Sequence, residues 1–485
     1  MFRHILIYTP ARFIPAIISL LNLAVFTRLL SVEQYGYFAL ATSAAMIFDG
    51  FFGQWLMASI MRFYAEQQAE PAVDRLLASC GMLFVLPAAL TCAIGIALAL
   101  FWGTAEPEQQ ALLLALPYFI IYTLEQLVLR VHMASLNSAR FTVLHLAQSA
   151  VSAGLGVGLV VYLSPEPIYA ILGMISGFLL ILAVDWRTTR RFFLWSRARQ
   201  DTLAEIVRFA WPTIFASGIA LLASRLNRFF IMALLGPAAV GLLNAAQALT
   251  EQALASVFMI VAMAAHPMTV KVQAEASPEA LEGRLRANAI WIFGIGLPSA
   301  VGFALLAPEL VTLFLGEDYH AQAIPIIPWI SAAAFFNAVR SHFIVHSFFL
   351  ARKVHYNLYI AVPALILTLA ANALLIPSYG IFGAVLAILV VEVASTLLAI
   401  ALTKRAIKLP IPIPEITRIG LATAAMGAAM LSISGEGTAT ALLLKLISAS
   451  IVFVLVAIAL NIENCRDKAI PLTRRLSAKA FPLSR

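Results

Sequence analysis

The chain has 485 residues, of which 62% are hydrophobic and only 12% are charged, whereas soluble domains carry about 25% charged residues. The formal charge of +8 comes from basic residues scattered over short loops rather than gathered on one soluble face, which argues against a nucleic-acid partner. Three cysteines are too few for a disulfide framework. This composition excludes an ordinary soluble protein and predicts an all-α, polytopic membrane protein.

Apolar stretches long enough to cross a bilayer follow one another along almost the whole chain. A membrane-spanning helix needs roughly 20 mostly apolar residues. By this measure we expect about fourteen spans, which in chain order are 8 to 30, 37 to 60, 77 to 102, 110 to 130, 141 to 163, 168 to 186, 208 to 235, 238 to 265, 288 to 315, 322 to 350, 356 to 376, 380 to 402, 416 to 433 and 438 to 460.

The loops between these spans alternate in charge. Loops after odd-numbered spans contain acidic residues and neither Lys nor Arg, namely Glu33, Glu106, Glu108, Glu317, Asp318 and Glu436. Loops after even-numbered spans and the C-terminal tail contain the basic residues Arg62, Arg75, Arg140, Arg187, Arg190, Arg191, Arg197, Arg199, Lys271, Arg284, Arg286, Arg352, Lys353, Lys404, Arg405, Lys408, Arg474 and Arg475. By the positive-inside rule the basic loops face the cytosol, so we expect both termini there.

The two halves of the chain resemble each other. The segment RLLSVEQYG at 28 to 36 has a counterpart in ALLGPAAVG at 233 to 241, and Gly173 and Gly383 fall at similar places in their halves. Chance similarity between apolar helices is the alternative, but agreement in order favours an internal repeat. We therefore expect an N-terminal lobe with its cytosolic linker at 1 to 200, a C-terminal lobe at 201 to 405, and two further spans with a basic tail at 406 to 485.

Three arginines of the second half lie away from the ends of their predicted spans. A charge at mid-membrane costs roughly 2.5 to 3.5 kcal/mol, so such residues usually face a cavity or a partner. Arg225 and Arg228 are spaced to share one helix face, and Arg340 lies near the middle of its span. Arginine suits phosphate because its planar fork holds two oxygens at once. The pattern predicts a cationic, substrate-binding lumen; the alternatives are pairing with acids such as Glu251 or Glu392, or snorkelling.

Among the acidic residues inside predicted spans, we single out Asp49, Glu125, Glu251 and Glu392. They are candidates for carrying a coupling proton or cation, or for balancing the arginines, and the sequence leaves both options open. His342 and His346 are one turn apart but have no further ligands at metal spacing. The run Gly154, Gly156, Gly158 lies in an apolar stretch, so it indicates close helix packing rather than a phosphate loop.

No nucleotide-binding loop, zinc motif or nucleophile elbow is found in the sequence. We therefore expect no cofactor, no metal, no catalytic residue and no direct use of ATP. The loops predicted to lie outside are short and contain no arginine. They leave little from which to build an enzyme active site.

Two stretches open the two halves of the chain: ARFIPAIISLLNLAVFTRLLSVEQYGYFALATS at 11 to 43 and VRFAWPTIFASGIALLASRLNRFFIMALLG at 207 to 236. They resemble the polysaccharide transporters of the multidrug/oligosaccharidyl-lipid/polysaccharide (MOP) exporter superfamily, especially the Wzx-type O-antigen and lipid-linked oligosaccharide flippases. Such proteins often read Ser-Arg-Leu-Asp-Arg where this chain has Ser224 to Arg228. Asn227 replaces the acid here, which leaves the arginines less neutralised and puts a coupling role at that position in doubt.

The resemblance implies two six-helix lobes around a central cavity in a bacterial inner membrane. It also implies a flippase for a polyprenyl-diphosphate-linked oligosaccharide, serving O-antigen, capsule or exopolysaccharide synthesis, with the bilayer and other polysaccharide assembly proteins as partners. The charged headgroup cannot cross hydrocarbon unaided, because its charges would lose their hydration. A lumen lined by Arg225, Arg228 and Arg340 would replace part of this lost hydration.

Three rival functions stay open at this stage. A cation-coupled multidrug exporter of the same superfamily should show an acidic lumen, and the arginines argue against it. A membrane-embedded polysaccharide polymerase or ligase would work on the outer face, where the loops are short. A structural subunit of a polysaccharide assembly is not excluded by the sequence.

Overall fold

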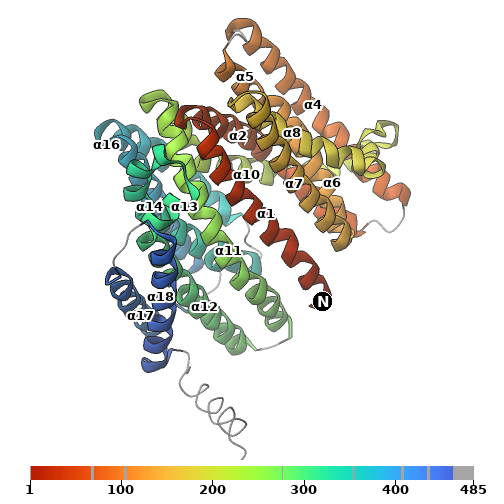
Figure 1. The fold of residues 1–485 in the computed structure, drawn as a ribbon. Helices are drawn as coiled ribbons and strands as arrows, with labels where there is room; N and C mark the ends of the chain where they lie inside the picture. Colours follow the sequence, from red (N-terminus) through yellow and green to blue (C-terminus); the bar gives the residue numbers. More distant parts are fainter. Residues whose placement is uncertain are drawn as a thin grey trace, which may run out of the picture. The chain divides into compact units, whose positions relative to one another are not determined.

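The computed structural model describes residues 2–66, 70–102, 106–275, 277–351, 353, 355–405, 409–433 and 437–462. All regular secondary structure in these ranges is helical (Figure 1). The predicted loop charges Arg352, Lys408, Glu436, Arg474 and Arg475 lie outside the described residues.

The helices coincide with the predicted spans, each span falling on one helix or on consecutive helices. Up to the middle of the chain they are α1 (Phe2–Leu29), α2 (Val32–Phe52), α3 (Gln54–Phe63), η1 (Tyr64–Glu66), α4 (Glu70–Trp102), α5 (Pro107–Leu113), α6 (Ala115–Ala134), α7 (Ser138–Tyr162), α8 (Pro167–Val184), α9 (Trp186–Thr189), η2 (Arg190–Phe193), η3 (Trp195–Arg197) and α10 (Gln200–Leu235). The others are α11 (Pro237–Glu275), α12 (Pro278–Leu305), α13 (Ala307–Phe314), α14 (Glu317–Val339), the π-helix η4 (Arg340–Ile344), α15 (Val345–Leu350), α16 (Tyr356–Thr403), α17 (Ile413–Leu431) and α18 (Ala439–Ala459).

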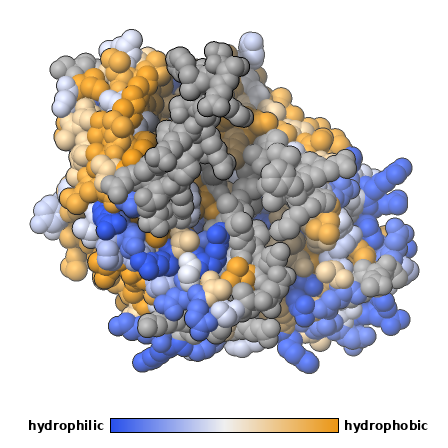
Figure 2. Space-filling model, turned by 90° about the horizontal axis from the view of Figure 1, so that it is seen from below, coloured by the Kyte–Doolittle hydropathy of each residue, from blue (hydrophilic) through white to orange (hydrophobic). Residues whose placement is uncertain are grey.

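Within the described residues, nine helices are long and apolar enough to cross a membrane, or ten if the bent pair α2 and α3 counts as one span. Large apolar side chains on α4 point outward, with Leu86 76% and Phe101 93% exposed. Water would penalise this exposure and lipid would not. Figure 2 shows one face of the molecule, on which strongly hydrophilic residues gather in patches beside hydrophobic surface. The chain is a multi-pass, all-α membrane protein.

The count of nine or ten helices is lower than the fourteen predicted spans, partly because α16 takes in two of them. The backbone leaves helical geometry at Gly380, where φ is 58° and ψ is −136°, a conformation that favours glycine. Beyond this point the chain turns back on itself. The evidence is that a Cβ atom on Gly383 would lie only 2.0 Å from the carbonyl oxygen of Leu375. The predicted break between 376 and 380 is therefore a tight, glycine-dependent turn.

The chain forms two compact units, each discontinuous in sequence. Unit 1 comprises Met1–Leu249, Phe314–Tyr319 and Asn357–Val391; unit 2 comprises Thr250–Leu313, His320–Tyr356 and Glu392–Arg485. The division into lobes at 1 to 200, 201 to 405 and 406 to 485 stays a prediction.

Glycines allow helices of unit 1 to pack with their backbones in contact. A Cβ atom on Gly173 of α8 would come within 2.2 Å of the Cα atom of Gly156 on α7, so these helices touch backbone to backbone. The close packing predicted for the glycine run is confirmed at Gly156, whereas Gly154 and Gly158 face open space.

The two segments matched as a repeat meet through their final glycines. A Cβ atom on Gly36 of α2 would lie 1.9 Å from the Pro237 carbonyl oxygen, and one on Gly241 of α11 would lie 2.0 Å from that of Val32. Each glycine thus admits the backbone of the other segment. This reciprocal contact is what an internal repeat related by a twofold axis would produce.

Two ion pairs join α17 and α18 to other helices of unit 2. Arg286 of α12 contacts Glu415 of α17 at 2.6 Å, and Lys445 of α18 contacts Glu309 of α13 at 2.5 Å. Apolar side chains pack between α12, α17 and α18 to form two clusters: Ile290, Ile419, Ala422 and Ile462, and Leu306, Met426, Met430 and Ala449.

Candidate functional site

Helix α10 carries two of the predicted lumen arginines. It packs against α2, α3 and α4 within unit 1. It continues without a break through Arg225 and Arg228 to Leu235, and Gly236, with φ of 86°, ends it. The two arginines therefore lie nearly one turn apart on the same side of one helix.

Arg228 is a buried, positioned cation. Its side chain donates from Nη1 to Ser43 Oγ at 2.7 Å, and from Nη2 to Gln247 Oε1 at 3.5 Å. The residue is only 5% exposed. Ser43 comes from α2 and Gln247 from α11, so Arg228 ties α10 to both.

Arg225 has a different environment. It is half-buried and interacts electrostatically with Tyr118 and Tyr122 on α6. Asp49 of α2 and Glu125 of α6 also interact electrostatically with these two tyrosine side chains. The two tyrosine rings stack on each other on α6, and a hydrogen bond from Thr123 on the same helix joins Asp49 to the helix of Glu125.

Asp49 is held by two hydrogen bonds. Thr123 Oγ1 donates to its Oδ1 at 2.8 Å, and Gln54 Nε2 donates to its Oδ2 at 2.6 Å. The 44° bend between α2 and α3 lies beside it. A Cβ atom on Gly53 at this bend would lie 2.1 Å from Asp49 Oδ1, so glycine leaves room for the carboxylate.

Glu125 is fully buried and only partly satisfied. Its Oε2 accepts a hydrogen bond from Gln126 Nε2 at 3.0 Å, whereas its Oε1 has no hydrogen-bond partner among the described residues. A buried carboxylate oxygen in this state is unfavourable unless the group is protonated or a cation lies beside it. This chemistry suits a residue that takes up a proton or a cation.

The remaining predicted site residues belong to unit 2. Arg340 opens the π-helix and contacts Glu392 of α16 at 2.6 Å, with the side chains 15% and 19% exposed. Asn337 Nδ2 donates to the same glutamate at 3.2 Å. For Arg340 the structure thus shows the pairing with Glu392 that the sequence left open. Glu251 lies on α11 and is exposed.

Sequence reasoning missed a buried ion pair inside the predicted spans. The side chains of Lys445 and Glu309 are 8% and 1% exposed. The sequence does indicate these two residues, because both are charged and both lie within apolar stretches.

A second missed cluster lies where α6, α7 and α8 end or begin. His132 forms a hydrogen bond to Asp185, and Arg140 contacts the same carboxylate at 3.1 Å. Burial raises the pKa of Asp185, but hydrogen bonds from His132, Thr188 and Arg140 outweigh it and hold the pKa below its usual value. The cluster joins three helices and suits a structural role.

Unit 2 also contains an apolar groove of about 500 Å³. It runs between α11, α12, α13, α17 and α18, and its lining includes Pro298, Phe303, Met426, Met430 and Phe453. A groove of this chemistry accepts hydrocarbon rather than sugar. Among the described residues, no group of three or more His, Cys, Asp or Glu side chains is placed to hold a metal ion.

Comparison by sequence gives one family. A family model described as polysaccharide biosynthesis protein matches residues 1–273 of the 485, which is more than half of the chain. No curated protein matches the chain significantly.

Solved structures give the fold. The chain is similar to lipid II flippase MurJ in an inward closed conformation, with a TM-score of 0.65 and 16% identity, over 94% of this chain and 99% of that one. It is also similar to an inward-facing multidrug resistance MATE family transporter of the MOP superfamily, with a TM-score of 0.58 and 14% identity over 86% and 95% of the two chains. A MOP superfamily transporter from Pyrococcus furiosus matches with a TM-score of 0.53 and 12% identity, over 84% and 96%.

Proposed function

Because this chain belongs to the family of polysaccharide biosynthesis proteins, we propose that it is a flippase for a polyprenyl-diphosphate-linked oligosaccharide. It moves this substrate by alternating access from the cytosolic to the outer leaflet of a bacterial inner membrane, with both termini in the cytosol. The product feeds the assembly of a surface polysaccharide.

The observation that carries the proposal is the pair Arg225 and Arg228 on one side of α10. A diphosphate that leaves water needs cations and hydrogen-bond donors to replace its hydration. Arg228 is already oriented by Ser43 and Gln247, so less conformational entropy is lost when an anion binds beside it. Arg225 is half-buried and supplies a second guanidinium group.

Asp49 and Glu125 are the residues of unit 1 that we propose to carry a coupling proton or cation. Both acids act on the same two tyrosines as Arg225, and Glu125 has an oxygen without a hydrogen-bond partner among the described residues. A proton or cation bound at Glu125 would satisfy this oxygen.

The polyprenyl tail of this substrate is hydrocarbon, so it needs no polar partner. The tail does not need to leave an apolar environment during transport, unlike the headgroup. One structural neighbour is named a lipid II flippase, which supports a lipid-linked substrate for this chain.

Complementation in cells tests the proposal. In a strain lacking the gene, Arg225→Ala with Arg228→Ala should abolish surface polysaccharide at wild-type protein level, whereas Arg208→Ala should leave it unchanged. Arg208 is a matched control because it is an exposed arginine near the start of the same helix. Normal polysaccharide in the double variant would contradict the assigned role of the pair.

The two buried acids favour one second candidate, a cation-coupled multidrug exporter. An organic cation could pair with Asp49 and Glu125, which are 2% and 0% exposed. In this case Glu125→Gln should abolish export of cationic dyes from cells, and the double arginine variant should retain it. The flippase proposal expects no dye export from either protein.

A further inference from the structure

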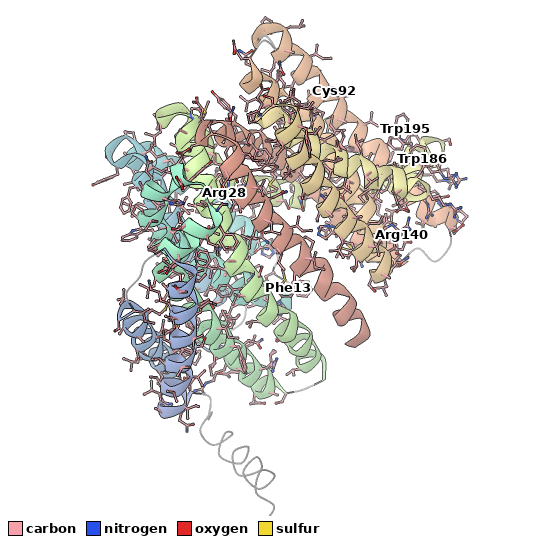
Figure 3. The ribbon with its side chains drawn as sticks, in the orientation of Figure 1. Phe13, Arg28, Cys92, Arg140, Trp186 and Trp195 are labelled. Carbon is pink, nitrogen blue, oxygen red and sulfur yellow. The ribbon has the colours of Figure 1, made fainter. Side chains whose placement is uncertain are left out.

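The segment between α8 and α10 gathers arginines and aromatic residues. It consists of α9, η2 and η3 within unit 1, and its arginines and aromatic residues are Trp186, Arg187, Arg190, Arg191, Phe192, Phe193, Trp195, Arg197 and Arg199. Figure 3 labels Trp186 and Trp195 on the yellow ribbon that follows α8. The proposed flipping reaction uses none of these residues.

One side of the segment is fixed to the helices of unit 1. Arg191 and Arg197 both pair with Asp74 of α4. Phe192 is fully buried, and a Cβ atom on Gly81 of α4 would lie 1.9 Å from its carbonyl oxygen. These contacts hold the segment in one orientation.

The six other aromatic and arginine side chains of the segment are exposed, three of them aromatic and three basic. Trp186, Phe193 and Trp195 are 58%, 50% and 47% exposed. Arg187, Arg190 and Arg199 are exposed as well, and no carboxylate of the described residues forms an ion pair with them. We call these six side chains the basic-aromatic surface.

The segment also follows the end of an apolar helix, where the proposed orientation puts a membrane boundary. The apolar helix α8 ends at Val184, two residues before Trp186, and the loop belongs to the basic set expected to face the cytosol. Tryptophan is enriched at the membrane interface because its ring is apolar and its N–H is polar. Arginines beside such rings lie at the level of the lipid phosphates.

We infer that the basic-aromatic surface binds the anionic phospholipid headgroups of the cytosolic leaflet, with its rings inserted at the interface. Arg187, Arg190 and Arg199, which form no ion pair with a carboxylate of the described residues, match phosphate oxygens in charge. The pairing of Arg191 and Arg197 with Asp74 fixes the segment that carries them. Binding anchors the chain where α10, the helix of Arg225 and Arg228, begins. The inference rests on the proposed membrane orientation and not on the proposed substrate.

Quenching of tryptophan fluorescence by brominated lipids tests it. The full chain is reconstituted in phosphatidylcholine vesicles with increasing fractions of brominated phosphatidylglycerol or brominated phosphatidylcholine. The fluorescence of the two tryptophans is obtained by subtracting the fluorescence of the double variant Trp186→Phe, Trp195→Phe from that of the wild type. We expect it to be quenched at a lower fraction of the anionic lipid than of the neutral one.

The triple variant Arg187→Gln, Arg190→Gln, Arg199→Gln should lose this preference. Each arginine contributes roughly fivefold, or about 1 kcal/mol, to binding an anionic leaflet. A control with the same loss of charge, Arg62→Gln, Lys404→Gln, Arg405→Gln, removes exposed cations from other loops and should keep it.

Two results would overturn the inference: equal quenching of the wild type by both lipids, or equal loss of preference in the control and the triple variant.

Raising the salt concentration should weaken the preference in the wild type, because exposed charges are screened. This measurement needs no variant and would contradict the inference if salt had no effect. Transport is not measured, so failure here would leave the proposed function standing.

Discussion

Exchanging the charges of Arg340 and Glu392 separates two roles that Arg340 can have. A lumen cation must stay positive to bind an anionic substrate. A structural partner of Glu392 needs only an opposite charge across the 2.6 Å contact. The variants are Arg340→Glu, Glu392→Arg, and the two together.

The expected size of the effect follows from burial. Removing one member of a buried ion pair costs roughly 3 to 5 kcal/mol, because the other charge is left without a partner. The two side chains keep 15% and 19% exposure, which lowers the cost of a lost partner. Each single variant also places two like charges together, so we expect a cost of about 3 kcal/mol or more. The double variant should recover about 2 kcal/mol or more, because it restores an opposite pair.

The assay is reversible unfolding of purified protein in detergent, combined with surface polysaccharide formation in cells. The structural role predicts low stability and low activity for both single variants and recovery of both properties in the double variant. Destabilisation by the double variant equal to the sum of the two singles would refute the pairing. Recovered stability with lost activity would show instead that Arg340 acts on the substrate.

Three further predictions concern packing and pH. Lys445→Met should destabilise the protein by about 3 kcal/mol in thermal unfolding, because Glu309 is left buried and charged, and a milder loss in Lys445→Met with Glu309→Leu would support this cause. Gly36→Ala should reduce the yield of folded protein in size-exclusion chromatography, because its Cβ atom would lie 1.9 Å from the Pro237 carbonyl oxygen; normal folding would contradict that contact. Asp185→Asn should lower stability by about 2 kcal/mol at neutral pH. Since the folded pKa of Asp185 is below its usual value, this contribution is present above about pH 4 and disappears as pH falls through the folded pKa; a difference between variant and wild type that stays constant down to pH 2 would contradict it.

The spans could be predicted because a bilayer requires long apolar runs, and these runs are visible in the sequence. The bend at Gly53 could not, because apolar residues on both sides of it satisfy the same requirement. The match between 28 to 36 and 233 to 241 indicated a repeat. It did not indicate that Gly36 and Gly241 meet, which depends on how the helices pack.

The candidate site was predictable to the level of helix geometry. The spacing of Arg225 and Arg228 predicted a shared helix side, and α10 is continuous through both. Their different environments were not predictable, because Ser43 and Gln247 reach Arg228 from other helices. Glu392 was foreseen as a partner for the arginines, although the choice of Arg340 required the fold.

The most direct test of the central claim is flipping of a labelled polyprenyl-diphosphate oligosaccharide in proteoliposomes. Wild type is compared with Arg225→Ala, Arg228→Ala and with Arg208→Ala at matched reconstitution. The proposed function predicts flipping by the wild type and the control, and a loss of at least tenfold in the double variant, equivalent to about 1.4 kcal/mol. Flipping by the double variant at the wild-type rate would contradict the cationic site, and no flipping by the wild type with its own pathway's glycan would contradict the substrate.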